Sequence, residues 1–150
     1  MDYIKDIRAL VGHKKIILVA AGAIITKGDQ ILLQRRSDNG NWSLVGGLME
    51  LDETFAETCI REAREETGLN VHLDYLVGVY HNHHAEWPNG DKAHVVCAVY
   101  KAIILSGEPR TDEESLELRF FDRDELPELP SEDYRDALRD YFAGLKNQVI

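Results

Sequence analysis

The chain has few of the residues that mark disulfide scaffolds, membrane spans or nucleic-acid surfaces. Its two cysteines, Cys59 and Cys97, do not form a CxxC pair, which argues against a zinc site and against a disulfide framework. No apolar run approaches the roughly 18 residues that a membrane-spanning helix needs. The 17 Lys and Arg residues are outnumbered by 27 Asp and Glu residues, for a formal net charge of −10. This acidic balance argues against a broad basic surface for duplex nucleic acid.

The N-terminal sequence lacks the basic and apolar regions of a signal peptide, so we expect a cytoplasmic protein. The chain is 150 residues long and 44% hydrophobic, which suits one globular domain with a buried core. No repeat, linker or low-complexity stretch divides it. The sequence predicts a single domain over residues 1–150, with a short helical extension at about residues 1–12. Ile4, Ile7 and Leu10 share one side of that extension and could dock on its own sheet or on a partner subunit, which leaves a homodimer open.

Hydrophobic patterning predicts one mixed α/β domain. We expect helices over residues 2–10, 54–67 and 131–145. Apolar runs and alternation predict strands over residues 16–25, 30–36, 42–45, 71–80, 93–105 and 115–121. Turn-forming and polar residues predict loops over residues 37–41, 81–91 and 108–114, with a short turn or helix at residues 124–129.

The densest chemical signal lies in residues 47–69, where a glycine turn leads into a carboxylate-rich helix. At about 100° of turn per residue, Glu62, Glu65 and Glu66 fall within about 100° of arc. By the same arithmetic, Glu66 falls inside the core-facing stripe of the helix, which is about 140° wide. That stripe consists of Phe55, Ala56, Cys59, Ile60, Ala63 and Thr67.

Two interpretations fit this acidic helix. A solvated face would be supported by i,i+4 partners such as Glu57 and Arg61. That interpretation leaves a charged Glu at the apolar margin, which is costly when it is unpaired. It also leaves Glu62 and Glu66 as a repelling i,i+4 pair. A bound cation explains both features better, and ligands that are all oxygen favour a hard ion such as Mg²⁺.

The spacing of these residues resembles the Nudix box. Gly47 is followed after five residues by Glu53, and Glu53 after seven residues by Arg61-Glu62, so the first half of the box is filled. The second half is filled by Ala63, Arg64, Glu65, Glu66, Thr67, Gly68 and Leu69. A preceding strand, Trp42 ahead of the double glycine, and the downstream Arg119-Phe120-Phe121 extend the resemblance to roughly residues 15–145. The sequence departs from the common pattern at Val45, where many relatives have proline, and at Asp52, where glycine is frequent.

The resemblance implies an α/β fold, specifically a Nudix-type α/β/α sandwich with a mixed β-sheet. It implies a site for Mg²⁺ or Mn²⁺ whose ligands are Gly46 (through its carbonyl), Glu62, Glu65 and Glu66. Arg61 and Glu53 would form an ion pair that holds the loop against the helix. Within the box, Glu65 or Glu66 would be the general base. A carboxylate from the loop over residues 112–114, Glu113 or Glu114, is the alternative, although a solvated acidic turn also fits that loop.

Substrate contacts are less strongly indicated. Arg35 and Arg36 leave a strand on opposite faces, so only one of them can face the cleft. Trp42 or Trp87 could stack on a base, although core packing is favoured for Trp42, whereas Trp87 falls in the predicted loop over residues 81–91. Tyr80 is a similar candidate to contact the substrate. The histidines at positions 81, 83 and 84 could hold a transition metal, but a polar loop that contacts substrate is the favoured interpretation.

Nudix enzymes hydrolyse the pyrophosphate linkage of a nucleoside diphosphate joined to another group. The resemblance therefore implies a metal-dependent hydrolase with a small-molecule nucleoside diphosphate derivative as its substrate. ADP-ribose, a nucleotide sugar, a nucleoside triphosphate, a dinucleoside polyphosphate and an RNA 5′ end all stay open, because the box contacts the diphosphate that they share. The alternative is a non-catalytic Nudix-fold module that binds nucleotide or regulates, which would not need all three carboxylates.

Overall fold

The computed structural model describes residues 2–149, so Met1 and Ile150, the two ends of the predicted domain, lie outside it. The α-helices are α1 (Tyr3–Val11), α2 (Phe55–Thr67) and α3 (Glu132–Phe142), and a 3₁₀ turn covers Arg123–Glu125. The strands are β1 (Ile16–Lys27), β2 (Gln30–Arg36), β3 (Trp42–Ser43), β4 (Val45–Leu48), β5 (Asn70–Glu86), β6 (Lys92–Ser106), β7 (Ser115–Phe121) and β8 (Gln148–Val149). None of these helices is both long and apolar enough to cross a membrane.

Strand β1 is the centre of a mixed sheet. It pairs in parallel with β6, from Ile16 beside Ala93 to Thr26 beside Ile103, and antiparallel with both β2 and β4. The main strand order is β3-β2-β1-β6-β5-β8, with β7 paired to β2. The mixed sheet confirms the predicted α/β fold.

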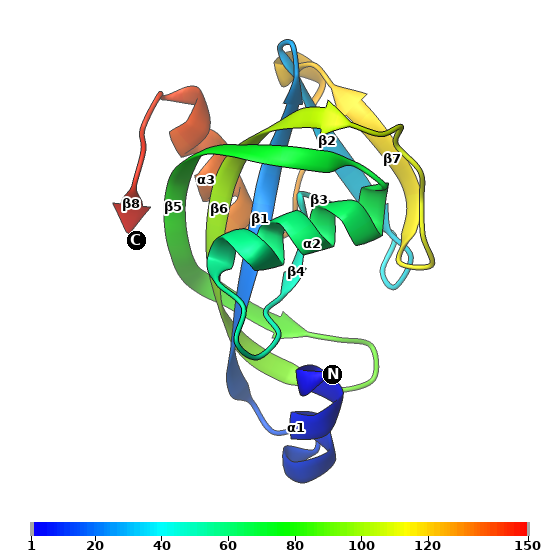
Figure 1. Cartoon of the computed structure of the whole chain (residues 1–150). Helices are drawn as coiled ribbons and strands as arrows, with labels where there is room; N and C mark the ends of the chain where they lie inside the picture. Colours follow the sequence, from blue (N-terminus) through cyan, green and yellow to red (C-terminus); the bar gives the residue numbers. More distant parts are fainter. Residues whose placement is uncertain (1, 150) are drawn as a thin grey trace.

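Helices α2 and α3 cover opposite faces of this sheet (Figure 1). Successive side chains of a strand point to opposite faces, and β1 feeds two separate cores in this way. Ala21 and Ala23 pack with Cys59 and Ala63 of α2, whereas the alternate residues of β1, such as Ile24, pack on the side of α3. Both predicted thiols, Cys59 and Cys97, are buried and free.

The predicted polar loop over residues 81–91 is wrong over its first half. Strand β5 continues to Glu86 and pairs with β6, with Ala85 opposite Ala93 and Glu86 opposite Lys92. The end of this β5–β6 hairpin extends past the body of the sheet towards α1 (Figure 1). Residues 81–86 are mostly polar, so hydrophobic alternation did not reveal this part of the strand.

Helix α1 packs on its own domain. The Tyr3 backbone N–H donates to Glu50 Oε2 at 2.8 Å, and Tyr3 and Ile4 pack against the core on the α3 side. Arg8 donates to the carbonyls of Gly12 and Lys92, at 3.1 and 2.7 Å. The N-terminal helix is thereby tied both to the loop before α2 and to the β5–β6 hairpin.

Candidate active site

The local sequence fixes both ends of the carboxylate helix α2. The Thr54 hydroxyl accepts a hydrogen bond from the Glu57 N–H, and Gly68 ends the helix in the left-handed region at φ 75°. Between these caps, Cys59, Ala63 and Thr67 are buried as the helical arithmetic predicted. Glu66 is also buried, with 2% of its surface exposed, so the carboxylate predicted to lie at the apolar margin does lie there.

A buried amide holds the Glu66 carboxylate. Gln34 of β2 donates through Nε2 to Glu66 Oε2 and to the Leu44 carbonyl, and its Oε1 accepts from the Ser115 hydroxyl at 2.7 Å. Every polar atom of this amide is therefore engaged, and Gln34 is only 1% exposed. Neither Gln34 nor Ser115 was predicted as a site residue from the sequence. The sequence does contain one signal for Gln34, because this polar residue directly continues the apolar run Ile31–Leu33 of a predicted strand.

Two carboxylates crowd one another at the end of β4. Burial, together with the neighbouring charge of Glu62, raises the pKa of Glu66 well above its ordinary value. The Glu62 side chain is itself only 12% exposed and lies where a side chain at Gly47 would otherwise sit. Two like charges that adjoin one another, one of them buried, disfavour full ionisation of both carboxylates unless a cation comes between them. This is the arrangement that a hard divalent ion stabilises.

The double glycine lies inside β4 instead of ending a strand over residues 42–45, which corrects that prediction. Gly46 pairs with Gly22 and Gly47 with Ala21 on β1. The backbone of β1 leaves no room for a side chain at Gly46, and the Glu62 side chain occupies the space beside Gly47. The turn that follows contains Asp52 at φ 67°, a left-handed backbone that favours glycine. A glycine at this position would adopt the same backbone without that strain.

Arg61 and Glu53 form the ion pair that the box implies. Arg61 Nε lies 2.6 Å from Glu53 Oε2, and Arg61 Nη2 also donates to the Leu48 carbonyl at 3.1 Å. Glu53 accepts further hydrogen bonds from the Glu50 N–H and the Thr58 hydroxyl. The Arg61 guanidinium and these donors lower the pKa of Glu53 to about 2. The pair therefore connects the loop before α2 to the body of the helix.

This lowered pKa makes a prediction about stability and pH. Replacing Glu53 with Gln is expected to lower the free energy of unfolding at pH 7 by about 1–2 kcal/mol, because a partly buried, solvent-screened charge-assisted pair is lost. Above its ordinary pKa of 4.5, Glu53 is ionised in both the folded and the unfolded protein, so its full contribution to the free energy of unfolding is present there. The contribution fades as the pH falls towards 2, so the gap between Glu53→Gln and the parent should close between pH 4.5 and pH 2. Urea unfolding at a series of pH values measures it.

The control for this prediction is Glu57→Gln, because Glu57 is exposed in the first turn of the same helix. It should change stability by less than about 0.5 kcal/mol at every pH. A gap for Glu53→Gln that stays constant down to pH 3 would contradict the role assigned to the Arg61 pair.

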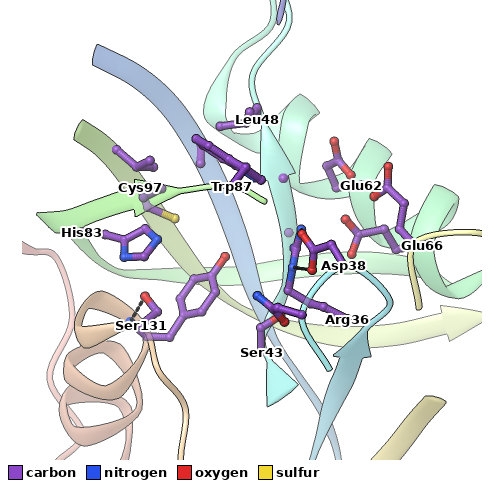
Figure 2. A pocket seen from close by; sticks show the side chains of 18 of the residues that line it. Arg36, Asp38, Ser43, Leu48, Glu62, Glu66, His83, Trp87, Cys97 and Ser131 are labelled. Atoms are coloured by element: carbon purple, nitrogen blue, oxygen red, sulfur yellow. Dashed lines mark hydrogen bonds and ion pairs between the residues drawn. The ribbon is translucent and has the colours of Figure 1, made fainter. Parts of the chain in front are cut away.

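A cavity of about 1100 Å³ adjoins α2, β4 and the β5–β6 hairpin. Figure 2 shows Glu62 and Glu66 on one side of it, with His83 and Cys97 on the other and Arg36 between them. The residues of the box that line it are Gly47, Leu48, Glu50, Arg61, Glu62, Glu65 and Glu66, and Gly46 lines it just ahead of the box. Other lining residues are Arg36, Trp42, His83, His84, Trp87, Glu114, Asp133 and Tyr134.

Some of the residues predicted to contact substrate line the cavity, and others do not. Arg36 lines it and is held by Asp38 through Nε and Nη2, at 3.0 and 2.9 Å. Arg35 is exposed and donates to the Gly40 carbonyl instead. Trp87 lines the cavity, as does Glu114, whose pKa burial raises, whereas Glu113 does not line it.

The prediction that Tyr80 contacts the substrate is wrong. Its side chain has no exposed surface, and its hydroxyl donates to Asp140 Oδ2 of α3 at 2.7 Å, inside the core. Register shifts in β5 before Gly78 and after Tyr80 change which residues face the cavity. His83 lies past the second shift and reaches the cavity in its place.

Glu65 differs from the other two carboxylates of the box. Its side chain is 56% exposed, against 12% for the Glu62 side chain, and its Oε2 lies 3.2 Å from Arg61 Nη1. In the part of the chain that the structure describes, no three Asp, Glu, His or Cys side chains converge as a ready-made metal site, the histidines of β5 included. The same Arg61 nitrogen, Nη1, also lies 2.9 Å from Glu62 Oε1, so a cation at these carboxylates would compete with Arg61 for both Glu62 and Glu65.

A family model described as the NUDIX domain matches residues 17–141. The chain belongs to the Nudix family. Helix α1, which packs against the cavity, lies ahead of the matched residues. The family match and the intact carboxylates agree on a hydrolase, and enzymes of this family generally use a divalent metal ion.

Named relatives agree with this assignment. The chain is 36% identical to a "MutT-like protein" of Streptomyces ambofaciens, over 83% of this chain and 75% of the relative. It is also 36% identical to an "ADP-ribose pyrophosphatase" of Methanocaldococcus jannaschii, over 83% of this chain and 72% of the relative. A crystal structure of a Nudix hydrolase from Nitrosomonas europaea superposes with a TM-score of 0.72 at 26% identity, covering 92% of this chain and 81% of the other. This Nudix hydrolase therefore acts on the pyrophosphate linkage of nucleoside diphosphate derivatives.

Proposed function

We propose that this Nudix hydrolase cleaves the diphosphate of ADP-ribose, or of a closely similar nucleoside diphosphate sugar, with Mg²⁺ or Mn²⁺ bound at α2. The observation that carries the proposal is the pair of adjoining carboxylates, the buried Glu66 and the largely buried Glu62, at one end of a cavity large enough for a nucleotide. The relative named as an ADP-ribose pyrophosphatase supports ADP-ribose as the first substrate to test.

Glu62 and Glu66 would hold the metal ion, with Glu65 and the Gly46 carbonyl as further ligands. The bound ion would neutralise charge on the diphosphate and lower the pKa of a water molecule for attack. The donor set fits such an ion because it consists of oxygen atoms only. Arg61 neutralises part of the acidic cluster and fixes the loop, so it orients the carboxylates without touching substrate.

Arg36 would bind a phosphate oxygen. Asp38 engages its Nε and Nη2, which leaves Nη1 free of that ion pair and fixes the plane of the guanidinium group. A preoriented guanidinium loses less entropy when it binds phosphate. The Asp38 charge and hydrogen bonds also raise the pKa of Arg36, so it remains cationic.

Two carboxylates are candidates for the general base. Glu65 lies beside the metal ligands on α2, and Glu114 reaches the same cavity from the loop before β7. Burial and neighbouring carboxylates raise the pKa of Glu114, which moves it towards the range of a base that works near neutral pH. Either residue could take a proton from the attacking water.

A substrate panel tests the proposal. With Mg²⁺, the parent should release AMP and ribose 5-phosphate from ADP-ribose faster than it hydrolyses nucleoside triphosphates, and EDTA should abolish both reactions. Glu65→Gln and Glu114→Gln identify the general base. Whichever variant lacks the base should have a kcat lower by roughly 10²–10⁴-fold. Glu113→Gln is the matched control for Glu114→Gln, because Glu113 lies outside the cavity.

The same panel distinguishes the alternative function. Nucleotide binding without metal-dependent hydrolysis of any member would identify a binding module and contradict the proposal. A preference for nucleoside triphosphates over ADP-ribose would contradict the proposed substrate class while leaving a hydrolase.

A further inference from the structure

Asp133 is a buried carboxylate with an unused acceptor. It lies in the first turn of α3, is 1% exposed, and lines the cavity. Its Oδ1 accepts a hydrogen bond from the Asn82 backbone N–H at 3.0 Å. Its Oδ2 is buried and has no hydrogen-bond partner, and no other side-chain N or O atom within residues 2–149 is in this position. Such an atom is costly to bury, so it needs an explanation.

The position of Asp133 separates it from the diphosphate site. Its neighbours His83 and Ser131 lie across the cavity from Glu62 and Glu66 (Figure 2). A substrate with its diphosphate at the carboxylates of α2 would extend its nucleoside or its second group towards this side. A carboxylate oxygen repels phosphate, so the group that meets Asp133 is a neutral or cationic hydrogen-bond donor.

The walls around Asp133 suit a flat ring. The Tyr134 ring lies against the backbone of β1, where its Cε1 and hydroxyl oxygen come within 3.3 Å of the position that a Gly22 Cβ would occupy. The half-buried His83 and the indole of Trp87 also line the cavity. Aromatic faces stack on nucleobases, whereas a ribose presents no comparable flat face.

We infer that Asp133 Oδ2 accepts a hydrogen bond from an N–H group of the substrate nucleobase, and that it selects bases carrying an exocyclic amino group at this edge. The inference rests on the proposed function, because it assumes that the diphosphate binds at α2. Asp133 would thereby determine specificity without taking part in hydrolysis.

The experiment compares two substrates that differ in one group. They are ADP-ribose and its analogue in which hydrogen replaces the 6-amino group of adenine, so that the base has no N–H. The parent should favour ADP-ribose in kcat/KM by about 10–100-fold, which is the range for a hydrogen bond to a charged acceptor. In Asp133→Asn, an amide N–H₂ can replace the unused oxygen, so the ratio should fall to about 1 or below. Glu132→Gln, on the exposed side of the same turn, should keep the parent's ratio.

A third substrate separates the base from the sugar. If the parent loses activity on the 2′-deoxy analogue of the adenosine ribose but not on the analogue without the amino group, Oδ2 takes a ribose hydroxyl and the inference is overturned. This comparison uses the parent alone, so it decides the question even if Asp133→Asn fails to fold.

The remaining outcomes separate the inference from the proposed function. Equal ratios in the parent and in a folded Asp133→Asn, with hydrolysis intact, would overturn the role of Asp133 alone. An equal loss on both substrates with a lower melting temperature would show that Asp133 only supports the fold. No metal-dependent hydrolysis of any substrate would instead overturn the proposed function.

Discussion

Replacing Glu66 with Gln is expected to lower kcat by roughly 10²–10⁴-fold while leaving the metal-free protein at least as stable as the parent. The loss of activity follows because the buried oxygen that faces the cavity would no longer carry charge for a cation. Stability is kept because an amide fits the same environment. Its oxygen accepts from Gln34 as the carboxylate does, and its N–H₂ group can donate to Glu62, which removes the repulsion between the two carboxylates.

Two measurements check this result together. Steady-state hydrolysis of ADP-ribose gives kcat, and thermal unfolding with and without Mg²⁺ gives the stabilisation by the ion. The parent should gain melting temperature on adding Mg²⁺, and Glu66→Gln should gain much less. Glu57→Gln on the same helix should match the parent in both. A Glu66→Gln variant that keeps its activity and its response to Mg²⁺ would remove Glu66 from the metal site.

The second large effect is expected from Gly47→Ala, which should lower kcat by about 10²-fold with little change in the fold. A Cβ at this position would lie 2.5 Å from Glu62 Oε1, so the carboxylate must move out of its place. The displaced atoms are the far end of a flexible side chain, which makes the movement easy. Activity falls because an error of about 1 Å in a catalytic group is enough to disturb the geometry of reaction.

Gly46→Ala at the neighbouring position is the matched control for Gly47→Ala. A Cβ at Gly46 would lie 2.5 Å from the Ala21 carbonyl oxygen and 2.7 Å from the Gly22 Cα, and both belong to the backbone of β1. Since backbone cannot move aside, Gly46→Ala should lower the free energy of unfolding by about 3 kcal/mol. Measuring kcat and urea unfolding for both variants separates the two roles. A Gly47→Ala variant that unfolds as easily as Gly46→Ala would show that both glycines serve packing alone.

The sequence predicted the carboxylate helix well because its information is local. Helical periodicity placed Glu66 among apolar residues, and the glycine at position 68 marked the end of the helix. The box spacing then supplied the ion pair between Glu53 and Arg61, which the structure contains. Each of these features depends on residues within about two turns of one helix or on a fixed loop before it.

The rest of the site depends on contacts between distant segments, which periodicity does not report. Gln34 meets Glu66 across 32 positions, and Asp133 meets the Asn82 N–H across 51. Register shifts within β5 turned Tyr80 into the core and His83 towards the cavity. Helix α1 was predicted as an extension, but its contact with Glu50 in the loop before α2 spans 47 positions.

The amide of Gln34 has a consequence for protein engineering. The 23 residues of the box contain the carboxylates, but the group that orients Glu66 lies in β2, and Ser115 in β7 orients that group in turn. Grafting the box alone onto an unrelated scaffold would transfer the carboxylates without Gln34, which orients Glu66. A working transplant would therefore need at least three segments from separate parts of the chain, chosen for how they meet in space.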